Sequence, residues 1–207
     1  MPNKVFVVGV GMTKFEKPGS REGWDYPDMA RESGTKALAD AGVDYSEIEQ
    51  GFVGYCSGDS TSGQRALYEL GMTGIPIVNV NNNCSTGSTA LYLARQAVAS
   101  GSADCVLALG FEHMSPGALG SVFKDRPSPF DRYDEATAEL VGHAEIPLAL
   151  RYFGGAGLAH MKQYGTQLST FAKIRAKASR HASNNPLALF RTVLSEDDVM
   201  NAPVMWP

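Results

Sequence analysis

Residues 81–101 read NNNCSTGSTALYLARQAVASG, an asparagine-rich turn followed by a cysteine and by a helix that Gly101 ends. The preceding residues 75–80 have the composition of a strand, which places Cys84 at a strand-to-helix corner. Unpaired backbone N–H groups converge at such a corner, and together with the helix dipole they favour an anion. We therefore expect the thiolate form of Cys84 to be favoured, with N–H donors that could hold an oxyanion during attack on a carbonyl.

The same cysteine has a plainer interpretation, because most free cysteines are small, buried apolar residues. Four hydroxyl side chains make the first turn of the helix polar, whereas its remainder is apolar on more than one side. This pattern indicates a helix that is buried along its body and open at its start. A nucleophile also needs a base within reach, and none is visible near Cys84, so the pattern leaves both interpretations open.

Strand and helix patterns alternate from the N-terminus to Gly110. Residues 5–11 form a continuous apolar run closed by glycines, typical of a strand covered on both faces. The further predicted strands are residues 51–56, 75–80 and 104–110. The predicted helices between them are residues 27–41, with Asp25 or Tyr26 near the cap and Gly42 as the stop, residues 64–70, and the cysteine helix. This order predicts an α/β fold with a layered, mainly parallel sheet, in which ligands gather at the carboxyl ends of the strands.

The character of the chain changes after Gly110. Residues 118–147 are rich in Pro, Asp, Arg and Glu without a long periodic run, and we expect an excursion from the sheet there. Helical spacing returns at residues 148–164 and 169–182, and the basic residues of the second helix form either a solvated face or a phosphate patch. We predict two domains, residues 1–114 and 115–207. Because residues 204–207 are again mostly apolar, we expect the chain to be interrupted there.

Composition excludes several classes of protein. A net charge of -4 argues against a nucleic-acid surface, and no apolar run approaches the roughly 18 residues of a membrane span. The three cysteines, Cys56, Cys84 and Cys105, show no C-x-x-C spacing, which disfavours a zinc site and a disulfide framework. We interpret Cys56 and Cys105 as packing residues. Without a signal peptide, the expected location is cytoplasmic or another reducing, peroxisome-like compartment.

The segment NNNCSTGSTAL resembles the nucleophile segment of the thiolase family, in the form found in its sterol carrier protein branch. Residues 5–15, 71–80 and 106–115 resemble the same branch. The resemblance implies a thiolase-like layered fold of two similar halves, with a loop domain inserted in the first half. This chain would supply the first βαβαβαβ half and much of the loop domain, while the second half is absent.

The resemblance also implies an activity, an acyltransferase reaction in which Cys84 takes the acyl group of a 3-oxoacyl-CoA. Coenzyme A would be a substrate, with no metal and no tightly bound cofactor. Tyr152 and Phe153 fall where relatives often carry pantetheine contacts, and residues 75–80 fall where relatives pair as homodimers. The catalytic histidine and second cysteine of the family come from the absent half, and His113 is the least implausible substitute here.

Three alternatives stay open at this point. The first is a lipid-transfer-like or scaffolding subunit, which would bind acyl-CoA without turnover. The second is an aldol lyase on the same fold, and the third is a relative of the ketoacyl synthases. Retention of Cys84 favours the thiolase, and the missing half favours the scaffold.

Overall fold

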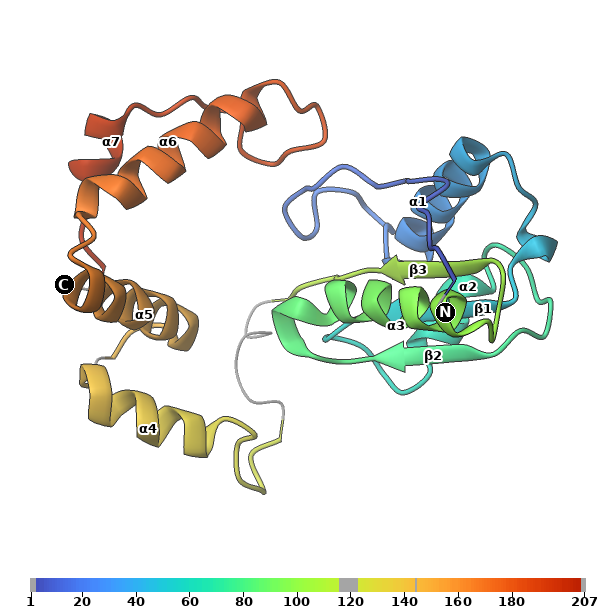
Figure 1. Ribbon diagram of the computed structural model, residues 1–207, viewed down its shortest axis with the longest axis horizontal. Helices are drawn as coiled ribbons and strands as arrows, with labels where there is room; N and C mark the ends of the chain where they lie inside the picture. The colour runs from blue at the N-terminus through green and yellow to red at the C-terminus, as the bar shows by residue number, and fades with distance from the viewer. Residues whose placement is uncertain (1–2, 116–122, 144, 206–207) are drawn as a thin grey trace. The chain divides into compact units, whose positions relative to one another are not determined.

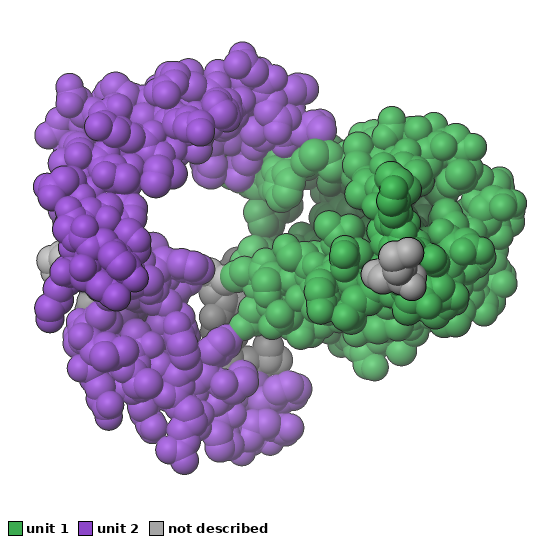
Figure 2. All heavy atoms as spheres, viewed as in Figure 1, with its two compact units in different colours: residues 1–118 green, residues 119–207 purple. Residues whose placement is uncertain are grey.

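The computed structural model describes residues 3–115, 123–143 and 145–205. Two compact units make up the chain, Met1–Ala118 and Leu119–Pro207 (Figure 2). The first unit contains the sheet and the cysteine corner, and the second is helical. Each unit is described by itself below.

The first unit is built on a parallel sheet whose strands are β1 (Gln50–Gly54), β2 (Ile77–Val80) and β3 (Val106–Gly110). Their order is β2-β1-β3, so β1 is central (Figure 1). The register pairs Gly54 with both Val80 and Gly110. The three strands therefore end side by side, and the segments that follow them start at one common edge.

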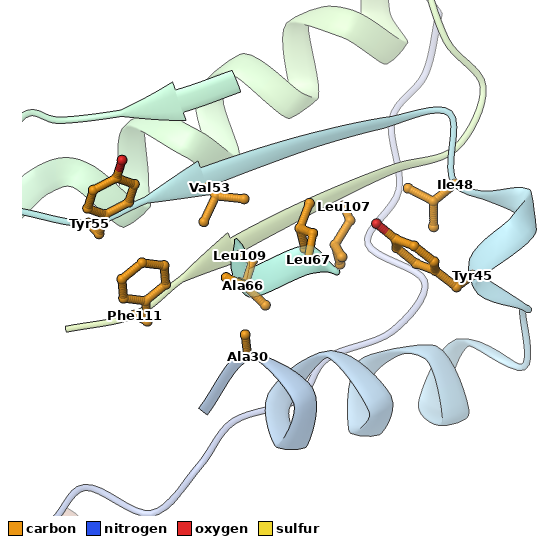
Figure 3. Packing of buried hydrophobic residues seen from close by; sticks show 10 residues of the cluster. All are labelled: Ala30, Tyr45, Ile48, Val53, Tyr55, Ala66, Leu67, Leu107, Leu109 and Phe111. Atoms are coloured by element: carbon orange, nitrogen blue, oxygen red, sulfur yellow. The ribbon is translucent and has the colours of Figure 1, made fainter. Parts of the chain in front are cut away.

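Side chains of the central strand alternate between two separate cores, as the period of two in a strand requires. Val53 belongs to the core between the sheet and the helices α1 (Tyr26–Ala41) and α2 (Ser62–Leu67). Figure 3 shows this core, with Ala30 pointing from α1 toward the sheet. Phe52 belongs to the opposite core, which α3 (Thr86–Ser100) covers with Ala90, Ala94 and Ala97. Both faces of β1 are thus covered, which explains its nearly continuous apolar sequence.

The predicted end of α1 at Ala41 is confirmed, and the helix begins at Tyr26, one residue before the predicted start. Asp25 is the N-cap and forms a capping box with Asp28, and Gly42 ends the helix with a left-handed φ of 69°. The helix after the cysteine likewise ends at Gly101, whose φ is 77°. The described part of the first unit also contains two single 3-10 turns, η1 (Tyr45–Glu47) and η2 (Asn83–Ser85).

The prediction of a buried first strand at residues 5–11 is wrong. This segment has no strand assignment, and the side chain of Phe6 is 73% exposed. It runs against α1, because a Cβ on Gly9 would lie only 2.4 Å from the carbonyl oxygen of Ala37, and the N–H of Val10 donates to Asp40. The absence of a side chain at Gly9 therefore lets this segment lie close to the backbone of α1. The apolar run does not pair with the strands of the described sheet.

The second unit contains four helices in its described part: α4 (Asp131–Val141), α5 (Leu148–Tyr164), α6 (Leu168–Ser183) and α7 (Glu196–Met200). The limits of α5 match the prediction, and α6 extends one residue beyond it at each end. The predicted excursion contains α4, which the aperiodic pattern did not indicate. No residue of α4 is fully buried, and its last residue, Val141, packs where a Cβ on Gly155 of α5 would lie.

Parts of two predictions lie outside the described residues. These are residues 118–122 and 144 of the excursion, and residues 206 and 207 of the apolar end. In the part of the chain that the structure describes, no helix has the length and apolarity needed to cross a bilayer.

Candidate active site

Three polar segments meet where the parallel strands end. Cys56 follows β1, Cys84 follows β2, and Glu112 follows β3. Hydrogen bonds connect these segments directly, although up to 56 residues separate them along the chain. This edge is where an open parallel sheet places its ligands.

Cys84 is exposed and lies in η2, two residues before Thr86, the first residue of α3. The preceding residue, Asn83, has a left-handed φ of 47°, a conformation that asparagine adopts more readily than most residues. The side chain of Asn81 accepts a hydrogen bond from the Asn83 N–H at 3.4 Å. The asparagines therefore shape the turn, as the sequence indicated, and the turn presents the thiol to solvent.

Thr86, the first residue of α3, fixes this turn through the hydrogen bonds of its side chain. Its side chain is buried, with 5% exposure, and its hydroxyl accepts from the N–H of Asn82 at 2.9 Å and donates to the carbonyl of Asn83. A Cβ on Gly54 at the end of β1 would lie 2.7 Å from the Thr86 methyl group. The helix start and the strand end are thus in close contact, which leaves the cysteine corner little room to move.

Cys56 supplies a second thiol to the same corner. Its Sγ donates to the carbonyl of Asn83 at 3.2 Å and lies 3.4 Å from the Thr86 hydroxyl. Burial raises the pKa of the Cys56 thiol, the Thr86 hydroxyl opposes that effect, and the negative charge of Glu112 adds to it. The interpretation of Cys56 as a strand packing residue needs correction, because β1 ends at Gly54 and this half-buried thiol contacts the turn beside Cys84.

Glu112 connects the ends of β3 and β1. One carboxylate oxygen accepts from the N–H of Cys56 at 3.0 Å, and the other accepts from the N–H of Ser57 at 2.9 Å. Charged acceptors make stronger hydrogen bonds than neutral ones, and two such bonds fix both the position and the orientation of the acceptor. Glu112 therefore holds the segment that carries the second thiol.

His113, the histidine that the sequence favoured as a substitute base, belongs to another contact. Its Nδ1 lies 2.7 Å from the carboxylate of Asp25, the N-cap of α1. Phe111 nearby stacks between Tyr26 and Tyr55 on the same face of the sheet. No hydrogen bond within the described residues joins His113 to Cys84, and a role as base stays a prediction.

Tyr152 and Phe153 lie in the second unit, on α5. The Tyr152 hydroxyl donates to Asp134 of α4 at 3.3 Å, and its ring meets Tyr133 edge to face at 4.7 Å. Phe153 is 76% exposed. Their assignment as coenzyme A contacts remains a prediction, and of the two it is Phe153 that offers a free apolar surface.

Sequence reasoning missed Cys56, Glu112 and Thr86 as parts of the cysteine corner. A usable signal existed, because Cys56 is the last residue of the predicted strand 51–56 and Glu112 follows the predicted strand 104–110 by two residues. In a parallel sheet those positions fall on one edge. What the pattern did not contain is the strand order, which decides that the ends of β1, β2 and β3 are neighbours.

Comparison with known proteins adds a family relationship. The family model for the thiolase N-terminal domain matches residues 5–134. Sterol carrier protein 2 of Oryctolagus cuniculus is 55% identical over 200 residues, which cover 96% of this chain and 37% of that protein. The benzoylsuccinyl-CoA thiolase subunit BbsB of Thauera aromatica is 32% identical over 208 residues, covering 99% of this chain and 50% of that protein.

A solved structure, the Ltp2-ChsH2(DUF35) aldolase, matches with a TM-score of 0.68 over 96% of this chain and 48% of that one. Its sequence identity is 21%, so the likeness shows the shared fold. The chain spans about half or less of the length of each of these three proteins.

Proposed function

The chain belongs to the thiolase family, and on this premise we propose that it carries the nucleophile of a thiolase-type acyltransferase. The reaction would be thiolytic cleavage of a 3-oxoacyl-CoA, or the reverse condensation, through an acyl group on Cys84. The single observation that carries the proposal is the exposed position of Cys84 before α3, at the carboxyl edge of the sheet.

The chemistry proceeds in two steps. The Cys84 thiolate attacks the 3-keto carbon, and the bond between carbons 2 and 3 breaks, with its electron pair leaving on carbon 2. Protonation of that carbon releases acetyl-CoA or propionyl-CoA, while the acyl chain, now two carbons shorter along its backbone, stays on sulfur as a thioester. The thiol of free coenzyme A then attacks this thioester, its proton is removed, and the Cys84 sulfur leaves as thiolate.

The corner suits this reaction because its dipoles are already oriented. The backbone N–H of Cys84 in η2, together with N–H groups at the start of α3, can donate to the oxyanion that forms at the attacked carbonyl. The 15 residues of α3 add the favourable end of a helix dipole. Residues that transfer the protons would come from the part of the family fold that this chain does not span.

Two further assignments belong to the same proposal. The exposed Phe153, with Tyr152, would contact the pantetheine arm of coenzyme A through apolar surface. The strand β2 lies at an edge of the described sheet and would pair with a second copy to form a homodimer.

A second candidate is a carrier or scaffolding subunit that binds acyl-CoA without turnover, or a lyase on the same fold. The name of the relative at 55% identity, sterol carrier protein 2, favours the carrier. The two candidates differ in their use of one sulfur atom. A carrier keeps its binding when Cys84 is replaced, whereas the acyltransferase loses its covalent intermediate.

Acylation of the thiol tests the proposal. The full chain is incubated with acetyl-CoA and with a 3-oxoacyl-CoA, quenched in acid and mapped by peptide mass spectrometry. We expect an acyl group on Cys84, none at that position in Cys84→Ser, and unchanged labelling in the control Cys105→Ser. Absence of acyl groups from Cys84, together with acyl-CoA binding that Cys84→Ser retains, would overturn the acyltransferase and favour the carrier or the lyase.

A further inference from the structure

Two thiols share the cysteine corner, and only Cys84 is exposed. We propose that Glu112 is a positioning residue that determines which of them accepts the acyl group, by withholding Cys56 from reaction. The selection of Cys84 rests on the proposed function, whereas the effect of Glu112 on Cys56 can be measured without it.

The closeness of the two thiols creates the need for such selection. The Sγ of Cys56 lies 3.2 Å from the carbonyl oxygen of Asn83, whose carbon is bonded to the nitrogen of Cys84. Standard peptide dimensions place that oxygen about 3 Å from the Cα of Cys84. The Cys56 sulfur is therefore within about 6 Å of the Cys84 Cα, and a thioester brought to one thiol comes near the other.

The geometry around Cys56 favours the protonated thiol over the thiolate. A carbonyl oxygen only accepts hydrogen bonds, so the contact with Asn83 forms only while Cys56 remains an S–H donor. The Thr86 hydroxyl donates its own proton to the same carbonyl, so it can donate to a Cys56 thiolate only by giving up that bond. A thiolate at Cys56 would face this carbonyl and the Glu112 carboxylate together, and the neutral thiol is a poor nucleophile.

Glu112 places a negative charge beside Cys56 and fixes the backbone of that segment by hydrogen bonds. Its two oxygens accept from the consecutive N–H groups of Cys56 and Ser57, which keeps an anion beside the thiol. The titratable groups that act on Cys56 are Glu112 and Cys84, and both disfavour its thiolate. Replacing the carboxylate by a neutral amide removes the charge and turns one of the two acceptors into a donor.

Alkylation of the full chain by iodoacetamide across a pH series, followed by peptide mapping of all three cysteines, tests the proposal. In the wild type we expect Cys84 to react and Cys56 to react slowly. In Glu112→Gln the pH midpoint of Cys56 alkylation should fall. Each pH unit by which it falls should raise the alkylation rate of Cys56 at neutral pH about tenfold. Glu112→Asp retains the charge and should keep the midpoint.

A matched control exists at the opposite edge of the sheet. Glu49 accepts from the N–H of Asp104 at 2.9 Å. Burial raises the pKa of the Cys105 thiol, and the negative charge of Glu49 adds to this effect. Glu49→Gln should therefore speed alkylation of Cys105 and leave Cys56 unchanged.

Three results would overturn the role of Glu112. They are equal rates for Cys56 and Cys84 in the wild type, an unchanged Cys56 midpoint in Glu112→Gln, and faster alkylation of all three cysteines at every pH. The last would mean that the variant only loosens the fold.

Acetyl-CoA separates the two proposals, because it should acylate Cys56 as well as Cys84 in Glu112→Gln. If it acylates neither thiol while the iodoacetamide difference persists, the proposed function fails and the action of Glu112 on Cys56 stands.

Discussion

The imidazole of His113 lies 2.7 Å from the carboxylate of Asp25, although 88 residues separate them in the chain. Asp25 is the N-cap of α1, and His113 follows β3 by three residues. The pair therefore ties the first helix to the end of an outer strand. It also gives one carboxylate two functions, because Asp25 accepts from the N–H of Tyr26 as well.

Replacing Asp25 separates these functions. Asp25→Ala removes the cap and the contact with His113, and we expect a loss of about 1 kcal/mol in unfolding free energy, the usual cost of a lost cap. Asp25→Asn keeps a competent cap and should cost less. Thermal denaturation followed by circular dichroism measures both, and equal losses would show that the charge dominates over capping.

The same pair predicts a pH dependence. Burial raises the pKa of Asp25, but the hydrogen bonds with His113 and Tyr26 together outweigh burial and hold this pKa below its ordinary value of 3.8. The ionised carboxylate is thus favoured in the folded state, so its contribution is present above the unfolded pKa and is lost as the pH falls through the lower folded pKa. We expect the stability difference between wild type and Asp25→Asn to shrink in that acid range, and a constant difference would contradict the assignment.

Gly54 and Gly87 should respond in opposite directions to alanine. A Cβ on Gly54 would lie 2.9 Å from the carbonyl oxygen of Thr86, so backbone must move, and we expect a cost of about 1–3 kcal/mol. A Cβ on Gly87 meets open space, and alanine there should stabilise the helix by up to about 1 kcal/mol. Urea denaturation of the two variants compares them. A neutral Gly54→Ala would mean that α3 does not start as close to β1 as described.

Thr86→Val tests the anchor of the cysteine turn. Valine keeps the shape of threonine but leaves the N–H of Asn82 without its buried acceptor, which costs about 1–3 kcal/mol. Thr86→Ser keeps the hydroxyl and should retain the bond. Amide hydrogen exchange at Asn82 should quicken in the valine variant alone, and equal exchange in both variants would exclude this role of the hydroxyl.

Pairing through β2 can be tested by charge. Val78 lies on this edge strand and is 41% exposed, and a lysine on an edge strand opposes pairing with another strand. We expect Val78→Lys to shift a dimer toward monomer in sedimentation velocity. The control Val193→Lys adds the same charge in the other unit. Dissociation by both variants, or by neither, would place the dimer contact elsewhere.

Local sequence determined much of the fold because the responsible interactions are local. The N-cap and stop of α1, the limits of α5 and the helix after Cys84 all depend on residues within a few positions of each other. The corner that exposes Cys84 belongs to the same class. A strand pattern, an asparagine turn and a polar first helical turn are read from consecutive residues. They predicted a helix that is open at its start, and the structure then decided that the thiol itself is exposed.

Only the tertiary structure decided the rest. An apolar run such as residues 5–11 has the same pattern whether it joins a ladder or lies along a helix, and the close approach of Gly9 to Ala37 is the physical difference. The sheet order β2-β1-β3 brings Glu112 to Cys56 and Cys56 to Asn83. Contacts between strand ends depend on that order and not on spacing along the chain, so the partners of the reactive corner are a property of the folded protein.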